Sequence, residues 1–400
     1  MRDARRWAGA YAVVTGILAA VFAIAILAGP YRAVERSDYM TYQTAARIVL
    51  QGRGGCLYTE ACQLQAQRDL IGDEPSFEEG VLPFNSPPWL PALLAPVGLL
   101  PLRLAFATFT LVSLALLALA TWRLAWGGRP TRLLATLILL SAWPTVMGGI
   151  RGQSTLSAAA LLGLSAAASV GGRRGRAGVH LGLAAIKPTL PIIWAVRLVV
   201  ERQWRALAVA AAAVLGLVLL AVVVVSPTAV TEYPQYLLNL AGGDVSAGVH
   251  VDEMINWRGA AVRLGAENTP LAIAGVIGTL ALVAAAWWWA RRSPRAPALG
   301  AGVAFTATPL VIWHANQHEA VLAMLGILVA IAALEELRVP LATVAISLQS
   351  LLWIGPALTG AGSAWLLFLI LLASLGGLAV LSWREGARYF SPVSVPTGNG

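Results

Sequence analysis

The segment RSDYMTYQ, residues 36–43, decides how the rest of the chain is arranged. It follows the first long apolar run, at about residues 7–29, which is long enough to cross a bilayer. The segment therefore marks the point at which the chain leaves the membrane and becomes polar. We expect the carboxylate of Asp38 at this membrane surface, flanked by Tyr39 and Tyr42, with a cavity formed by the later apolar helices beneath it.

The composition is that of an integral membrane protein. Of the 400 residues, 58% are hydrophobic and only 12% are charged, whereas soluble domains carry about 25% charged residues. The formal net charge is +9, but the arginines stand in short clusters between apolar runs, as they do where positive residues face the cytoplasm. Nothing resembles the aromatic and basic groove that binds single-stranded nucleic acid. We therefore expect no nucleic-acid partner.

The apolar runs predict an all-α integral membrane protein with about twelve transmembrane segments. No small-x-small cleavage site ends the first run, so it is interpreted as a retained signal anchor with a cytoplasmic N-terminus. Residues 1–390 are expected to form a single polytopic domain, and residues 391–400, rich in Pro, Gly and Ser, a disordered tail. The runs lie at about residues 7–29, 88–100, 102–122, 133–149, 155–170, 177–200, 206–225, 270–290, 298–313, 320–334, 339–355 and 363–383.

Two polar loops interrupt this pattern, at about residues 30–86 and 226–268. Together they carry thirteen of the nineteen acidic residues, so they cannot lie in hydrocarbon. Both are expected outside the cytoplasm, with short helices along the membrane interface. Cys56 and Cys62 both fall in the first loop. An extracytoplasmic loop permits a disulfide between them, and two free thiols are the alternative.

Simple alternation of the spans conflicts with the charges at two places. It puts Arg129, Arg132 and the cluster at residues 173–176 outside, against the positive-inside rule. A re-entrant segment at 88–100 and a pair of half-helices around Lys187-Pro188 would place these arginines inside. The sequence leaves both topologies open.

Lys187 is the only lysine in the chain, and it lies inside an apolar segment, residues 181–188. A cation at the centre of a membrane helix costs about 2.5–3.5 kcal/mol on insertion scales, so it marks a function by default. Pro188 removes a helical hydrogen bond and breaks the helix. A cation at such a break suits a phosphate group, and the alternative is a lysine that reaches the interface from a short helix.

A second polar cluster, residues 313–319, separates two apolar runs. His314 and His318 are four residues apart and would share one face of a helix. Zinc would need a third ligand or a His-Glu-x-x-His pattern, and neither is evident, so no metal site is expected. Hydrogen bonding to a phosphate or a sugar is the preferred interpretation, and a plain interfacial loop is the alternative.

Arg151 and Gln153 also interrupt apolar sequence, on either side of Gly152. The planar donors of arginine match phosphate, and glycine permits close approach of the backbone. An ordinary turn between two helices would explain the same residues equally well.

A carboxylate that acts as a general base must touch the hydroxyl it deprotonates. Asp38 stands near the membrane exit, whereas other acidic residues of its loop lie too far from the bilayer to meet a lipid headgroup. It is therefore the first candidate, and Asp252 and Glu253 of the second loop are the next.

Several short motifs, taken in order, resemble glycosyltransferase family 87. These are polytopic enzymes of the GT-C fold that include mannosyltransferases of phosphatidylinositol mannoside synthesis and some arabinofuranosyltransferases. The resemblance spans roughly residues 30–320. Asn85-Ser86 departs from it, because an aromatic residue is expected before the proline pair. The motifs are Asp38 with Tyr42 and Ala45-Ala46, a Gly-rich end with Leu57-Tyr58, Phe84-Asn85-Ser86-Pro87-Pro88, Gly152-Gln153 and Ala184-Ala185-Ile186-Lys187-Pro188.

The resemblance implies a GT-C-type helical bundle that transfers a hexose, with mannose as the first choice, from a polyprenyl-phosphate donor to a lipid or glycan acceptor. Asp38 is then the catalytic base of an inverting reaction that needs no metal and no cofactor. The active site is expected on the extracytoplasmic side of the plasma membrane. The donor phosphate and sugar would contact Lys187, Arg151, Gln153, His314, His318 and Tyr42, and the acceptor-side candidates are Asn85, Asp252 and Glu253.

Two rival functions are kept. One is transfer of arabinofuranose or another sugar from the same class of donor. The other is a transporter or flippase of a lipid-linked solute, with Lys187 in the translocation path. The absence of an evident repeat of two halves weakens the transporter reading. A membrane scaffold without chemistry would predict that Asp38→Asn and Lys187→Ala change nothing beyond stability.

Overall fold

The structure is a computed structural model that describes residues 34–72, 82–125, 128–241, 250–265, 270–334 and 360–389, with a few positions between 9 and 24. Within these ranges the regular structure is entirely helical, which confirms the all-α prediction. The predicted spans at 7–29 and 339–355 and the tail at 391–400 lie wholly or largely outside the described residues.

Four described helices are long and apolar enough to cross a membrane. They are α6 (Leu102–Leu124), α12 (Trp204–Val224), α15 (Pro270–Ala290) and α19 (Gly360–Arg388), the last over Ala364–Arg388. The pair α7 (Arg129–Leu140) and α8 (Trp143–Arg151), bent by 55°, would make a fifth span. The chain is therefore a helical membrane protein.

The described helices do not support the predicted count of about twelve spans. Several of the predicted runs form helices too short to cross a bilayer of about 30 Å on their own. A proline inside a helix removes a backbone hydrogen bond and weakens the helix, and Pro96 and Pro309 lie within two of these helices. These helices are α5 (Trp89–Gly98), α9 (Thr155–Val170), α16 (Ala296–Val311) and α17 (Ala320–Ala333).

The run at 177–200 folds as a pair of half-helices, one of the alternatives that the sequence left open. α10 (Arg174–Leu183) and the short η3 (Ala184–Ile186) approach the break at Lys187, and α11 (Ile192–Val200) leaves it. α10 packs closely on α12, since a Cβ at Gly178 would come within 2.3 Å of the Ala206 carbonyl oxygen. Ser169 and Gln203 are joined by hydrogen bonds of 2.8 and 3.0 Å. The turns before α10 and after α11 therefore lie at the same end of the bundle.

The other arginine-bearing turns lie at this end too, which is called the arginine end. α6 and α9 run side by side in the same direction, since Ser113 bonds Ser157 at 2.7 Å and Gly163 packs against Leu124. The start of α7 therefore lies at the same end of the bundle as the end of α9. Arg197 near the end of α11 stacks over the ring of Trp287, which brings the α15–α16 turn to the same place. The arginine end carries Arg129, Arg132, Arg173, Arg174, Arg176, Arg202, Arg205, Arg291, Arg292 and Arg295.

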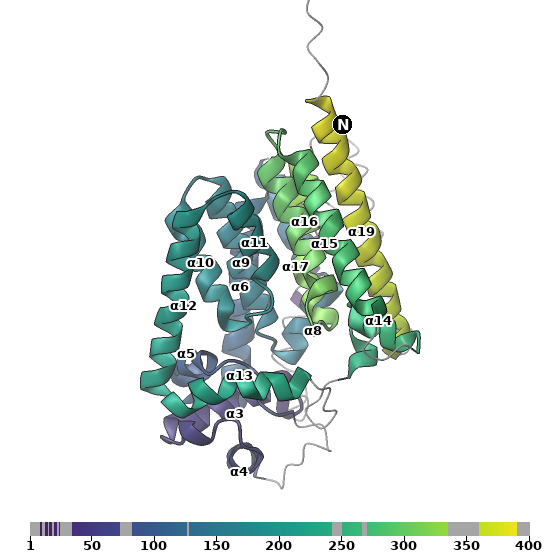
Figure 1. The fold of residues 1–400 in the computed structure, drawn as a ribbon. Helices are drawn as coiled ribbons and strands as arrows, with labels where there is room; N and C mark the ends of the chain where they lie inside the picture. Colours follow the sequence, from purple (N-terminus) through teal and green to yellow (C-terminus); the bar gives the residue numbers. More distant parts are fainter. Residues whose placement is uncertain are drawn as a thin grey trace, which may run out of the picture.

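The two polar loops meet at the opposite, loop end, where α3, α4 and α13 lie across the bundle (Figure 1). The first loop holds α3 (Asp38–Leu50), η1 (Gly54–Cys56) and α4 (Glu60–Ile71). The second holds α13 (Pro227–Ala241), η5 (Val251–Glu253) and α14 (Trp257–Arg263).

Contacts between aromatic residues and a disulfide hold the loop end together. The ring of Tyr58 stacks on that of Tyr233 in α13, with centroids 5.6 Å apart. Tyr236 donates a hydrogen bond of 2.5 Å to the side chain of Asn85. Cys56 and Cys62 are joined as a disulfide, the first of the two alternatives that the sequence left open.

Close helix packing fixes the loop between α16 and α17. A Cβ at Gly302 would come within 3.0 Å of the Gly326 carbonyl oxygen, and a Cβ at Gly326 within 2.8 Å of that of Gly302. Small residues of this kind let membrane helices approach closely. The loop at 312–316 and the short η6 (Gln317–Glu319) are consequently held at the loop end.

Candidate functional site

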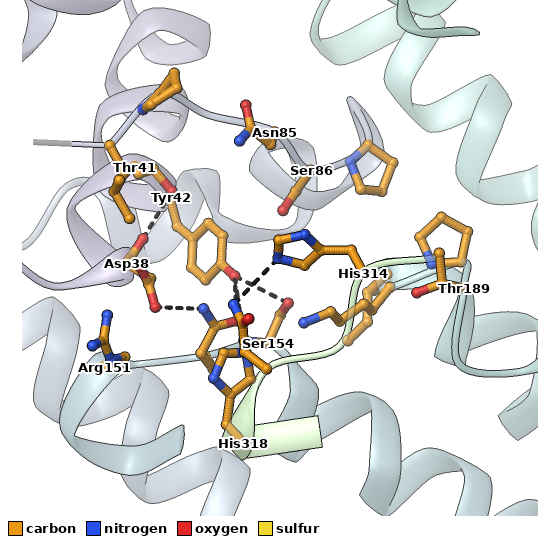
Figure 2. Close-up of a pocket in the computed structure, with 18 of the residues that line it drawn as sticks. Asp38, Thr41, Tyr42, Asn85, Ser86, Arg151, Ser154, Thr189, His314 and His318 are labelled. Carbon is orange, nitrogen blue, oxygen red and sulfur yellow. Dashed lines mark hydrogen bonds between the residues drawn. The ribbon is translucent and has the colours of Figure 1, made fainter. Parts of the chain in front are cut away.

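A cavity of about 560 Å³ opens at the loop end, lined by both polar loops and by three interruptions of apolar helices (Figure 2). The interruptions are the turn at 151–154, the break at 186–189 and the loop at 313–318. Non-helical backbone at membrane depth is tolerated where it lines a cavity. The three places where the sequence broke its apolar pattern therefore converge on one site.

Asp38 is the first residue of α3 and is 92% buried, yet its carboxylate faces the cavity. A carboxylate in the first turn of a helix interacts favourably with the helix dipole. The Gln153 side-chain amide donates a hydrogen bond of 2.5 Å to Asp38 Oδ2. Among the described residues no other hydrogen bond to this carboxylate is found, so Oδ1 is available to a ligand.

Gln153 also connects Asp38 with Tyr42. The Tyr42 hydroxyl lies 3.4 Å from Gln153 Oε1 and 3.1 Å from Ser154 Oγ. Gly152 makes this arrangement possible, because its φ is +62° and a Cβ there would come within 2.6 Å of Tyr39 Cβ. Only glycine meets both demands without strain. The turn at 151–154 is thus locked against α3, with the amide of Gln153 oriented by partners on both sides.

The side chain of Lys187 forms an ion pair with Glu319, a residue distant in the sequence, and does not extend to the membrane interface. Its Nζ also donates to Thr155 Oγ1 at 2.7 Å. Glu319 is fully buried and accepts further hydrogen bonds from His318 Nε2 at 3.0 Å and from the Asn316 backbone amide at 2.7 Å. The charge of Lys187 is therefore already compensated within the protein.

The two histidines line the cavity but do not share a helix face, contrary to the prediction. His314 lies in the loop before η6, where its Nε2 is 3.2 Å from the Asn316 side chain. His318 lies within η6 and bonds Glu319. Burial lowers the pKa of His314 to about 4, so this imidazole is neutral at pH 7.

Within the described part of the chain, no group of three or more His, Cys, Asp or Glu residues could hold a metal ion.

The remaining predicted residues are divided between the cavity and its surroundings. Arg151, the exposed last residue of α8, lines the cavity, as do Asn85 and Glu253. Asp252, one residue before Glu253 in η5, is not among the lining residues. Nine of the ten predicted site residues thus lie around one space, and their roles stay predictions.

The model of glycosyltransferase family 87 matches residues 84–312, more than half of the 400 residues. The chain belongs to glycosyltransferase family 87. It is therefore a membrane glycosyltransferase, and the transporter and scaffold alternatives are set aside. No curated protein and no solved structure matches the chain.

The matched range covers only part of the cavity of this family 87 enzyme. It includes Arg151, Gln153 and Lys187 but begins after Asp38 and ends before His314. The role of Asp38 as the base stays a prediction, supported by the position of Asp38 in the cavity and by the order of the motifs in the sequence.

Sequence reasoning missed several residues that shape the site. Glu319 could have been found, because Asn316 and Glu319 have the spacing of a capping box and form one in the structure. Thr155, at the start of an apolar helix, carried no signal of its contact with Lys187. Arg258 and Trp313 also line the cavity, from parts of the chain 55 residues apart. Such a pairing cannot be read from local sequence.

Proposed function

We propose that this family 87 enzyme transfers a hexose, with mannose as the first candidate, from a polyprenyl-phosphate donor to a hydroxyl group of a lipid or glycan acceptor. The observation that carries the proposal is the carboxylate of Asp38, buried in the wall of a cavity that also holds the side chains of Lys187 and Arg151. The cavity lies at one end of a membrane helix bundle, where a lipid carrier could enter sideways between helices.

Asp38 is assigned as the general base. One carboxylate oxygen is held by Gln153, and the other can accept the proton of the acceptor hydroxyl. The acceptor oxygen then forms a bond to the anomeric carbon while the bond from that carbon to the phosphate oxygen breaks. Attack from the face opposite the leaving group inverts the configuration at this carbon. Polyprenyl phosphate leaves with the bonding electrons.

Fixed donors and cations around the cavity stabilise the charge on the departing phosphate. Arg151, Gln153 and the neutral imidazole of His314 line the cavity together with Lys187. On the acceptor side, Asn85 and Glu253 are the lining residues that could contact the incoming hydroxyl compound. The proposed reaction draws on neither a metal ion nor an organic cofactor.

Two observations support an extracytoplasmic active site in the plasma membrane. The arginine clusters lie at the end of the bundle away from the cavity, as expected for a cytoplasmic end. The disulfide between Cys56 and Cys62 lies in the loop on the cavity side, and disulfides persist outside reducing compartments. The donor phosphate would accordingly sit at the outer surface of the bilayer.

The test is a donor panel offered to membranes that contain the protein. Radiolabelled polyprenyl-phosphate mannose, glucose and arabinofuranose are incubated with membranes carrying wild type or Asp38→Asn, and label transferred to lipid and glycan fractions is counted. We expect transfer from the mannose donor by wild type alone. Transfer only from polyprenyl-phosphate arabinofuranose would assign arabinofuranose in place of mannose. Transfer from none of the three donors would refute a polyprenyl-phosphate sugar as the donor.

A further inference from the structure

Arg258 is a buried cation in the cavity wall that has no counter-ion among the described residues. It is the second residue of α14 and is 91% buried. Its Nε makes no hydrogen bond, and no ion pair or hydrogen bond of its guanidinium to the described part of the chain is found. Buried polar groups are almost always satisfied, so an unsatisfied one requires an explanation.

The guanidinium is held rigidly in place. It stacks over the indole ring of Trp313 with 4.3 Å between Cζ and the ring centroid, and Trp313 also lines the cavity. The segment before α14 is pinned to the same loop, because the Ile255 amide bonds the Ala315 carbonyl at 2.8 Å and the Asn256 side chain bonds the Ile312 carbonyl at 2.8 Å. The stacking on Trp313 and these hydrogen bonds between distant parts of the chain thus fix the position of Arg258 in the cavity wall.

Lys187, a partly buried cation of the same cavity, offers a direct contrast. Its charge is compensated by Glu319, which is fully buried, and its Nζ also bonds Thr155. A compensated ammonium attracts an anion less than an uncompensated one does. Guanidinium in addition presents planar paired donors that fit phosphate oxygens. The stronger seat for an anion in this cavity is therefore on α14.

We propose that Arg258, held against Trp313, binds the phosphate group of a lipid substrate in the cavity. The inference rests on the proposed function, in which the donor is a lipid phosphate, and it adds a residue that neither the family match nor the motifs single out. The phosphate could belong to the donor or to an anionic lipid acceptor, and the ligand chemistry is the same in both cases.

The test measures binding of radiolabelled decaprenyl phosphate to the purified full-length protein in detergent, with uncharged decaprenol and with phosphatidylglycerol as parallel ligands. Arg258→Gln is compared with Arg263→Gln, because Arg263 also lies on α14 and stacks on a tryptophan, Trp365, at 4.7 Å but does not line the cavity. We expect Arg258→Gln to weaken decaprenyl phosphate binding at least tenfold and to leave decaprenol binding unchanged. Arg263→Gln should leave the binding of both ligands unchanged.

The parallel ligands decide the source of the phosphate. A loss confined to phosphatidylglycerol would keep the seat and assign it to an anionic acceptor. Equal losses for decaprenyl phosphate and decaprenol, or no loss for either anionic lipid, would overturn the proposal. Should Arg258→Gln fail to fold, Arg258→Lys carries the test: a threefold or greater loss for decaprenyl phosphate alone supports the seat, and affinity equal to wild type contradicts it.

The inference and the proposed function can fail separately. Transfer that depends on Asp38, combined with unchanged lipid-phosphate binding in Arg258→Gln, would remove only the role of Arg258. Selective loss of lipid-phosphate binding in Arg258→Gln, combined with no sugar transfer by wild type, would keep the phosphate seat and remove the transferase reaction.

Discussion

Two buried carboxylates stand at the cavity, and their surroundings differ. Glu319 is fully enclosed and held by Lys187, His318, Thr155 and a backbone amide. Asp38 is held by one neutral amide, that of Gln153, and opens to the cavity. A carboxylate surrounded by partners fixes structure, whereas one with a free oxygen can take a proton from a substrate. The comparison teaches that burial alone does not identify the catalytic acid or base.

The largest difference between the two carboxylates should appear in stability. Glu319→Gln leaves the ammonium of Lys187 without its counter-ion, and breaking a buried pair in this way costs about 3 kcal/mol. Asp38→Asn keeps a side chain that can still accept the Gln153 hydrogen bond, so its thermal unfolding in detergent should match wild type. If Glu319→Gln unfolds at the same temperature as wild type, the two carboxylates do not differ in their contribution to stability.

A double substitution sharpens the same point. Lys187→Met together with Glu319→Leu removes both charges at once, and replacing a buried pair by apolar residues is often neutral for stability. We expect the double variant to recover about 2 kcal/mol of the loss seen in Glu319→Gln. Thermal unfolding of Lys187→Met, of Glu319→Leu and of the double variant measures the coupling energy between the two residues. Losses of stability that simply add would contradict a direct ion pair.

Gln153 should affect turnover rather than folding. Gln153→Leu removes the only described hydrogen bond that orients the Asp38 carboxylate, so we expect a loss in kcat of about tenfold, equivalent to about 1.4 kcal/mol. Ser154→Ala serves as the control, because Ser154 contacts Tyr42 but not Asp38. Equal effects of the two substitutions would argue against a specific role for the amide.

A pH dependence of stability is also expected from His314. Its pKa is lowered to about 4 in the folded protein by burial, whereas an unfolded histidine has a pKa of about 6.5. The unfolded state therefore binds more protons between these values, and stability falls as the pH drops from about 6.5 towards 4. His314→Gln should lose less stability over this interval than wild type, as measured by unfolding at pH 7 and pH 5.

The polar interruptions of the apolar runs predicted several of the residues that line the cavity. Arg151-Gly152-Gln153, Lys187-Pro188 and the cluster at 313–319 each break an apolar run, and the structure brings all three to one space. Breaks were readable because polar and proline residues are costly inside membrane helices.

Other features could not be predicted from the sequence, because they depend on contacts between distant residues or on which side of a short helix a residue faces. Glu319 forms an ion pair with Lys187, the residue predicted to bind phosphate, across 132 residues of sequence, and no local pattern indicated this partner. Glu253 lines the cavity while its neighbour Asp252 does not, which depends on the turn of η5. The count of about twelve spans was too high for the described residues, since runs broken by proline and glycine fold as short helices.

The proposed reaction requires the carboxylate of Asp38 as its proton acceptor. The most direct measurement takes one preparation of Asp38→Asn and determines both its dissociation constant for decaprenyl-phosphate mannose and its rate of mannose transfer. We predict a dissociation constant within about threefold of wild type and a transfer rate at least about 100-fold lower. Transfer at the wild-type rate, or loss of donor binding in step with transfer, would contradict it.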